Sequence, residues 1–520
     1  MKETAPFGLS NPLAELLDKP REEFTRADLL KVIESRGIER ITFHYTALDG
    51  KLKELKLPVL SRAQADEVLA MGERADGSSL FKGMVDMGLS DVYVVPEYRT
   101  AFINPFDPLS LDFICRYLSG AGEPVAFALD NILIRAAGAF KERSGLELRA
   151  LGELEFFLLS QPADASFPGR HQRGYHDAMP FIKTGPVLDQ MLSVISRLMG
   201  AVKYGHSEVG FIERVTSDLD EVNGRRAEQM ELEFLPRPVE EMADDLVLSR
   251  WVIRNIAFRN GLVATFTPKL EEGVAGNGLH FHLELLREGR SVMTDAEGNL
   301  SLEARRLIGG LCEYAESLTA FGNTVASSYL RLVPNQEAPT RVCWSDLNRS
   351  VLIRVPLGWT RLGDLACRVN PQEKKRLETG GQSRQTVELR SPDGSALIHL
   401  ILAGITAAAC WAFGGGREEG RDALELAEKL YVKGNIFQDK KLLAQLPVLP
   451  SSCAASGRLL LKKRDLYERD GIFPPSVIEY MAGLLQAEDD EALQQRISTM
   501  PEDQRLKFLR RVMHRDLHRH

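Results

Sequence analysis

The chain has 520 residues, in which 65 Lys and Arg face 73 Asp and Glu, for a net charge of −8. This length predicts two or more domains or one large catalytic body. With 44% hydrophobic and 27% charged residues, the composition excludes disordered, collagenous and coiled-coil chains. The acidic balance lacks the basic footprint of proteins that bind nucleic acid or anionic membranes, so small solutes are the expected partners.

The N-terminus and the cysteines both favour a cytoplasmic protein. Residues 1–20 carry acids and prolines where a secretory signal needs a basic patch followed by an apolar run. The six cysteines have no short spacing for zinc or a disulfide frame, which predicts reduced and mostly buried thiols. Segment 396–413 has the length and apolarity of a membrane span, but it contains His399 and Thr406 and stands alone, which favours a buried core helix.

In chain order, the pattern predicts short strands first and mixed helices and strands afterwards. Residues 39–59 alternate apolar and polar side chains around Asp49-Gly50, a hairpin signal. Gly and Pro at 118–127 precede a helical pattern over 130–145, so we place an N-terminal domain at 1–125 and a catalytic domain at 126–520. A helical pattern at 240–261 between strand patterns at 152–159 and 278–285 indicates an α+β fold. The basic, His-rich end, 510–520, is predicted to be a solvated helix end rather than a metal site.

Four apolar strand patterns carry polar pairs at positions i and i+2. Side chains at this spacing share one face of a strand. The pairs are Glu153 with Glu155, Glu231 with Glu233, His280 with His282, and Glu388 with Arg390. A single pair is typical of an ordinary amphipathic strand with one solvated side. Four pairs together predict one shared polar cavity.

A cavity of this kind needs cations, because carboxylates cannot share a dry space without neutralisation. Oxygen ligands with one or two imidazoles favour Mg²⁺ or Mn²⁺ over zinc. Two such ions would clamp a transferring phosphoryl group, and arginine side chains would neutralise its oxygens. The candidate arginines are Arg331, Arg349, Arg354 and Arg390.

A series of short motifs identifies a family resemblance. They are DGSS (76–79), VP (95–96), INPF (103–106), GELEFF (152–157), HSE (206–208), QME (229–231), GNGLHFH (276–282), SYLRLVP (328–334), EAP (337–339), NRS (348–350) and ELRSPD (388–393). In these motifs and in their order, the chain resembles the bacterial type I glutamine synthetases. The resemblance extends from about residue 35 to about residue 400 and weakens toward both ends.

The resemblance implies a fold, an activity and an assembly. The implied fold is α+β, with a small N-terminal β-grasp domain before a large catalytic domain. In the catalytic domain an antiparallel sheet curves into a half-barrel with flanking helices, and a C-terminal helical extension follows. The implied activity is ATP-dependent ligation of ammonia to glutamate through γ-glutamyl phosphate, with Mg²⁺ or Mn²⁺ at two or more positions per site. The implied assembly is a homo-oligomer, a dodecamer of two hexameric rings, with active sites shared between subunits.

The resemblance also implies roles for individual residues. The ligands of one metal ion are Glu155, Glu208 and Glu231, and those of the ATP-associated ion are Glu153, His280 and Glu388. The nucleotide phosphates are contacted by His282, Arg349 and Arg354, of which Arg349 is also catalytic. The residues that bind glutamate are Glu155, Gly276, Arg331 and Arg390. Asp76 of a neighbouring subunit binds and deprotonates ammonium, and Glu337 is the flap acid that closes over it.

Some positions depart from the family pattern and leave other functions open. Ala275 replaces an Asn, Leu270 a Pro and Glu284 a Ser, and insertions follow Glu208 and Arg354. Long loops at a site mouth can change substrate choice. The alternative is therefore a γ-glutamyl-amine ligase for a polyamine or ethanolamine. A third hypothesis, a non-catalytic scaffold homologue, predicts the loss of metal ligands, whereas all six are present.

Overall fold

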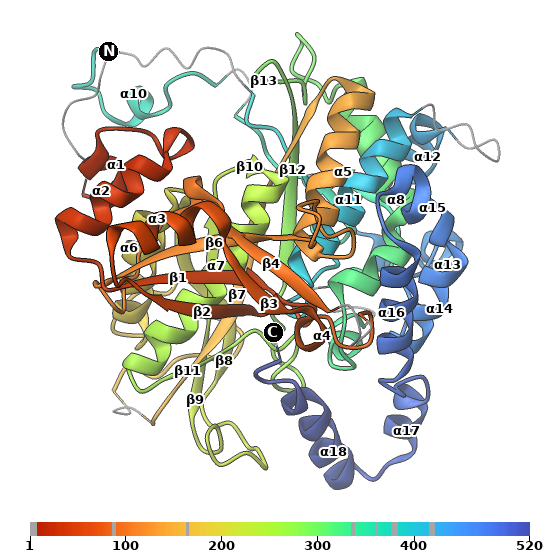
Figure 1. Ribbon diagram of the computed structural model, residues 1–520. Coiled ribbons are helices and arrows are strands. Elements are labelled where there is room, and N and C mark those ends of the chain that lie inside the picture. Colours follow the sequence, from red (N-terminus) through yellow and green to blue (C-terminus); the bar gives the residue numbers. More distant parts are fainter. Residues whose placement is uncertain are drawn as a thin grey trace.

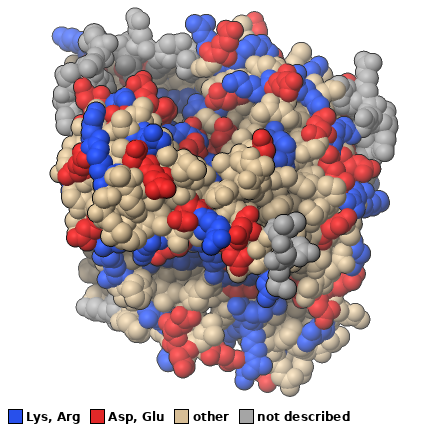
Figure 2. Space-filling model, in the orientation of Figure 1, with Lys and Arg blue, Asp and Glu red and all other residues tan. Residues whose placement is uncertain are grey.

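The computed structural model describes residues 8–85, 90–162, 166–333, 338–359, 362–375, 383–414 and 422–519. The protein has two β-sheets, and helices cover the outer side of the larger one (Figure 1). The predicted α+β class is confirmed. Lys and Arg are interspersed with Asp and Glu over the face that Figure 2 shows, so that face carries no extended field of one sign.

The N-terminal sheet has six strands in the order β2-β1-β6-β4-β3, with β5 alongside β6. Its strands are β1 (Arg40–Thr46), β2 (Leu52–Pro58), β3 (Glu73–Asp76), β4 (Asp91–Pro96), β5 (Phe102–Ile103) and β6 (Ser110–Leu118). The helices of this region are α1 (Pro12–Leu17), α2 (Arg26–Arg36), α3 (Arg62–Met71) and α4 (Gly77–Leu80). β1 and β2 pair antiparallel across Asp49-Gly50, and Gly50 has φ 75°. The predicted hairpin is confirmed.

The second sheet has ten strands, with β14-β15-β16-β12-β7-β9-β8 in order and β10, β11 and β13 at its margins. Its long strands are β7 (Glu147–Ser160), β8 (Val202–Ile212), β9 (Arg226–Phe234) and β12 (Leu279–Arg287). The short strands are β10 (Arg237–Pro238), β11 (Val263–Thr265), β13 (Arg290–Ser291), β14 (Trp344–Asp346), β15 (Ile353–Val355) and β16 (Val387–Leu389). Neighbouring strands are antiparallel except β14 and β15.

The helices that pack on this sheet bury its apolar face. The helices of this region are α5 (Leu129–Ser144), α6 (Gly185–Met199), α7 (Val239–Arg259), α8 (Leu302–Gly322), α9 (Ser328–Arg331) and α11 (Ile398–Phe413), whereas α10 (Ala366–Val369) has no buried residue. α11 packs against α5 and α8 and is buried along nearly its whole length. A helix that is apolar all round is stable only when it is buried, and the predicted core helix is confirmed. Within the described ranges, no helix combines the length and apolarity needed to span a bilayer.

The C-terminal helices run along the edge of the molecule and return to the sheet (Figure 1). They are α12 (Ala423–Lys429), α13 (Lys440–Gln445), α14 (Cys453–Lys462), α15 (Arg464–Glu468), α16 (Pro475–Gln486), α17 (Leu493–Thr499) and α18 (Glu502–Arg515). The prediction of a solvated helix end at 510–520 is wrong for its inner side. His514 is 3% exposed and Leu517 2% exposed, because α18 packs on the segment between β11 and β12.

One apolar core extends through both sheets. Buried side chains of β1 and β6 belong to the same cluster as those of α7 and β7. Arg116 of β6 donates to Asp244 of α7 at 3.0 Å and so adds an ion pair between the two regions. All six cysteines are free thiols and five of them are buried, which confirms the prediction made from their spacing.

Candidate active site

Strand register brings the predicted polar pairs into rows across the ten-stranded sheet. Glu153 of β7 lies opposite His280 of β12 on one side and Glu233 of β9 on the other. One step along, Glu155 lies opposite Glu231. Directly opposed residues on neighbouring strands have Cβ atoms about 5 Å apart, so these side chains meet.

The rows continue across the sheet to β15 on one side and β8 on the other. Glu388 of β16 lies between His282 of β12 and Arg354 of β15, and His206 of β8 lies opposite Glu231. The four predicted pairs therefore face one space. The predicted shared polar cavity is confirmed.

This cavity has a volume of about 1310 Å³. Of the residues that the family resemblance singles out, its lining includes Glu153, Glu155, Glu208, Glu231, Gly276, His280, His282, Arg331, Arg349, Arg354, Glu388 and Arg390. Asp76 is exposed on the N-terminal sheet and does not line it. Glu337 lies outside the described residues.

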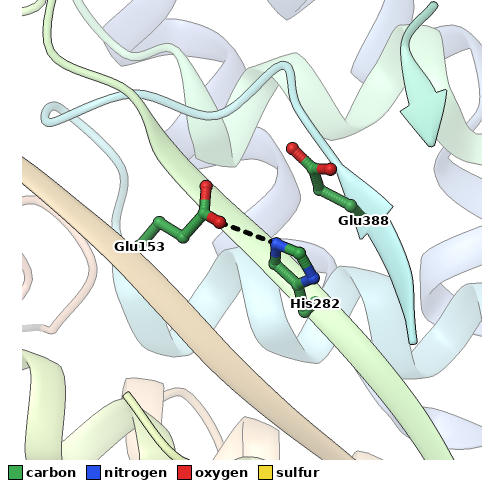
Figure 3. Close-up of side chains that lie close together, drawn as sticks. All are labelled: Glu153, His282 and Glu388. Carbon is green, nitrogen blue, oxygen red and sulfur yellow. Dashed lines mark hydrogen bonds and ion pairs between the residues drawn. The ribbon is translucent and has the colours of Figure 1, made fainter. Parts of the chain in front are cut away.

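Glu153 stands at the centre of a hydrogen-bonded group. Its carboxylate lies 2.8 Å from Nδ1 of His280 and 2.9 Å from Nε2 of His282. Figure 3 shows Glu153, His282 and Glu388 converging from three different strands. Glu388 accepts from Arg354 at 2.9 Å and from Arg390 at 3.0 Å. Every member of the group has a charged partner at hydrogen-bond distance.

The carboxylates differ in their electrostatic surroundings. Burial by itself would raise the pKa of Glu153, but His282 and His280 outweigh it and the pKa is lowered. The pKa of Glu231 is raised well above its usual value, first by burial and then by the carboxylates of Glu153, Glu155 and its other acidic neighbours. The carboxylates around Glu231 are therefore short of positive charge.

The donors suit hard divalent cations. Three groups each hold three possible ligand atoms within 4.8 Å of one another, namely Glu153, His282 and Glu388; His206, Glu208 and Glu231; and Glu153, Glu231 and Glu233. Carboxylate oxygens dominate each group, as Mg²⁺ and Mn²⁺ prefer. The shortage of positive charge around Glu231 also fits a cation there. The residues present therefore fit the metal ions that the resemblance implies.

The geometric groups differ in part from the predicted ligand sets. His282 takes the place of His280 beside Glu153 and Glu388, although Nδ1 of His280 also lies 3.7 Å from Glu388. His206 joins Glu208 and Glu231, whereas Glu155 accepts hydrogen bonds from Gln229 and the backbone of Gly278.

Sequence reasoning placed Glu233 in the shared cavity but not among the metal ligands, and it assigned no role to the side chain of His206. His206 carries a signal that could have been used, because it precedes Glu208 at the same i, i+2 spacing as the other pairs. Tyr175 and Trp359 also line the cavity. No local pattern marks these two aromatic residues as site residues.

The glycine-rich turn before β12 comes very close to its neighbours. A Cβ atom at Gly276 would lie 2.2 Å from the carbonyl oxygen of Pro268 and 3.2 Å from the side chain of Arg331. A Cβ atom at Gly278 would lie 2.9 Å from Nη2 of Arg331. Arg331 in turn donates to the carbonyl oxygen of Ser391 at 3.0 Å. Glycine at these two positions lets the backbone approach the arginine that the resemblance assigns to glutamate.

Hydrogen bonds from two neighbouring serines stabilise the ionised form of the Asp76 carboxyl group. The hydroxyls of Ser78 and Ser79 each donate to it at 2.7 Å, and these bonds lower its pKa to about 2. An exposed carboxylate with this pKa is ionised at neutral pH.

A second cavity, of about 730 Å³, lies between α18 and the turn at 216–219. Two of its arginine side chains have carboxylate partners within the chain. Arg511 pairs with Asp218 at 2.7 Å, and Arg510 pairs with Glu271 at 2.9 Å. Because these charges are already neutralised, the larger cavity is the better candidate for the active site.

Comparisons with known proteins identify the family of the chain. The family model for the glutamine synthetase catalytic domain matches residues 131–500, and that for the glutamine synthetase β-grasp domain matches residues 37–120. The chain belongs to the glutamine synthetase family. Members of this family are ligases that generally use ATP and divalent metal ions. The β-grasp expectation for the N-terminal sheet is thereby confirmed.

Individual members of the family resemble the chain over most of its length. A glutamine synthetase of Thermus thermophilus is 30% identical over 74% of this chain and 79% of its own. A glutamine synthetase of Aquifex aeolicus is 26% identical over 90% of this chain and 96% of its own. Among solved structures, Plasmodium falciparum glutamine synthetase has a TM-score of 0.70 at 19% identity, covering 91% of this chain and 97% of its own. The structure of GmaS without ligand has a TM-score of 0.69 at 21% identity, and the match covers 92% of this chain and 98% of the GmaS chain. At such identities the solved structures support the fold, including the curved sheet flanked by helices.

Proposed function

We propose that the chain is an ATP-dependent ligase that joins ammonia to the γ-carboxylate of glutamate and forms glutamine. The observation that carries this proposal is the convergence of carboxylates, imidazoles and arginines from six strands and their loops on one cavity of about 1310 Å³. Phosphoryl transfer to a carboxylate depends on positioning and charge neutralisation, which such a lining provides.

The proposed ligand sets are those that the resemblance implies, with His206, Glu233 and His282 as neighbours that complete them. Divalent ions bound there would neutralise the phosphate oxygens of ATP. Glu153 of β7 and Glu388 of β16 lie on the two strands that flank β12, so their carboxylates could bind the same cation.

The chain's own side chains would divide the remaining work. Arg331 and Arg390 hold the carboxylates of glutamate, while His282, Arg349 and Arg354 contact the phosphates of ATP. An oxygen of the γ-carboxylate attacks the terminal phosphorus of ATP, the bond to the β-phosphate breaks, and ADP leaves. The amine nitrogen then attacks the acyl carbon of the γ-glutamyl phosphate, and inorganic phosphate leaves.

The proton of ammonium must be removed before its nitrogen can attack. Asp76 and Glu337 are the proposed acceptors. Asp76 is ionised and exposed but lies away from the cavity of its own chain, which supports a site completed by the neighbouring subunit of a ring. Glu337 would close over the site and keep water from the acyl phosphate.

A second candidate acceptor is a larger amine, favoured by apolar surface at the cavity mouth. Leu357 is 70% exposed, Trp359 49%, Tyr175 48% and Tyr204 44%, and all four line the cavity. Ammonium gains nothing from such surface, whereas an alkylamine would bury its methylene groups against it at about 0.8 kcal/mol for each.

Phosphate release from ATP with Mg²⁺ and glutamate tests both candidates. Ammonium is compared with methylamine, ethanolamine and polyamines, with Glu337→Ala as the negative control. The highest kcat/KM for ammonium supports glutamine synthesis, and the highest value for a larger amine supports the second candidate. The absence of amine-dependent turnover would contradict both.

A further inference from the structure

The segment 266–278 connects the active site to the C-terminal helix. Its last part carries Ala275 and Gly276 into the lining of the large cavity. Its first part lies against α18 and the residues that follow it, which end beside the sheet (Figure 1). His514 and Leu270, which are in contact here, lie 244 positions apart in the sequence, so only the tertiary fold brings them together.

Three hydrogen bonds attach this segment and its flank to the C-terminus. Thr265 donates to the carbonyl oxygen of Leu517 at 2.7 Å, and Thr267 donates to that of Met513 at 2.9 Å. His514 donates from Nε2 to the carbonyl oxygen of Leu270 at 2.9 Å. All these groups are buried, and an unpaired buried polar group costs about 1–3 kcal/mol.

His514 contacts a third segment as well. A carbonyl oxygen can only accept, so Nε2 carries the proton and Nδ1 accepts from the hydroxyl of Ser217 at 2.9 Å. Ser217 belongs to the insertion after β8. Leu517, Leu270 and Val274 also pack in one small apolar cluster with side chains of that insertion. One imidazole thus joins the helix, the insertion and the glycine-rich segment.

The contacts continue from this junction to the substrate pocket. Lys269 donates to the carbonyl oxygen of Val274, and Asn277 donates to that of Thr267 at 2.9 Å. Gly276 lies against the side chain of Arg331. The steps from α18 to Asn277 are therefore hydrogen bonds between buried groups, and the half-buried Gly276 lies next to Arg331.

We propose that α18 is a positioning element for the glutamate end of the active site, with His514 as its main contact. The helix and the insertion hold segment 266–278 at the depth where Gly276 meets Arg331. The identity of the positioned substrate rests on the function proposed above, whereas the attachment itself does not.

His514→Ala tests this role, with His514→Gln as the conservative variant, because the glutamine amide can donate to Leu270 and its oxygen can accept from Ser217. His518→Ala is the matched control, since His518 is half-exposed and pairs with Glu221 of the same insertion at 2.8 Å. We expect His514→Ala to raise the KM for glutamate about tenfold or more, as the loss of one buried hydrogen bond implies. The KM for ATP should change little, His514→Gln should recover most of the loss, and His518→Ala should match the wild type.

Hydrogen–deuterium exchange provides a measurement that needs no activity. In His514→Ala, amides 269–278 should exchange faster than in the wild type, while those of β7 should not change. Unchanged exchange at 269–278 would overturn the proposal, as would equal rises in KM for glutamate and ATP. If His514→Ala does not fold, Thr267→Val removes one of the three bonds at nearly constant volume, and the same two readouts decide. A wild type without ligase turnover would refute the proposed function, and the exchange experiment would still decide the attachment.

Discussion

Charged side chains line both the large cavity on the sheet and the smaller cavity beside α18, but the two cavities differ in how these charges are paired. Around Glu231 several carboxylates face one another, and its pKa is raised by burial and by that crowding. Beside α18, Arg511 and Arg510 have carboxylate partners within 3 Å. Charges left crowded are available to a ligand, whereas charges paired internally connect chain segments. The following substitutions test this difference, from the largest expected effect to the smallest.

Glu231→Gln should lower kcat about a thousandfold, or about 4 kcal/mol, because it removes a charged oxygen from the proposed metal site. The same change should raise the thermal stability of the metal-free protein, since it relieves repulsion among buried carboxylates. Phosphate release and melting curves in EDTA and in Mg²⁺ measure the two effects. Unchanged turnover in Glu231→Gln would remove this carboxylate from the site.

Asp245→Asn tests how burial alters the pKa of a carboxyl group outside the active site, because Asp245 is buried in α7 and lines neither cavity. Burial raises its pKa to about 7. The carboxyl of Asp245 therefore keeps its proton in the folded state up to about pH 7, whereas in the unfolded state it loses the proton near pH 4. The contribution of Asp245 to the free energy of unfolding is thus largest below pH 4 and falls as the pH rises toward 7. Relative to Asp245→Asn, the wild type should lose about 3 kcal/mol between pH 5 and pH 8. Urea unfolding at both pH values, at one protein concentration, measures this; parallel curves for the two proteins would contradict it.

Gly276→Ala tests the close approach of the backbone at the large cavity. Its Cβ would lie 2.2 Å from the carbonyl oxygen of Pro268, so the segment must shift at a cost of about 1–3 kcal/mol. We expect a lower melting temperature and a higher KM for glutamate. Gly138→Ala in α5 is the control, because nothing lies within 4 Å of its Cβ position and alanine favours a helix. Equal behaviour of the two variants would show that the approach at Gly276 is not tight.

Asp218→Asn should have the smallest effect. Its partner Arg511 is 61% exposed and Asp218 is 57% exposed, so water screens the pair. Activity should match the wild type, and the melting temperature should stay within experimental scatter. A large loss of activity from Asp218→Asn would show that the smaller cavity takes part in the reaction after all.

Much of the site could be predicted because its residues carry local signals. The i, i+2 pairs of β7, β9, β12 and β16 are visible in the sequence, and the motifs place them in one family. The partners within the site could not be predicted, because they depend on which strands pair and in what register. The approach of both His280 and His282 to Glu153 is one such case. Burial of His514 is another, since a basic, His-rich end has the same pattern in water as in a packed junction.

The sequence by itself determined the types of side chain, their alternation along each strand and the apolar character of α11, because these depend on near neighbours. Only the tertiary structure decided that Glu153 lies between His280 and Glu233, and that the last helix reaches the segment before β12. Contacts between distant segments follow from the packing of the whole chain. Short-range periodicity along the chain cannot specify them.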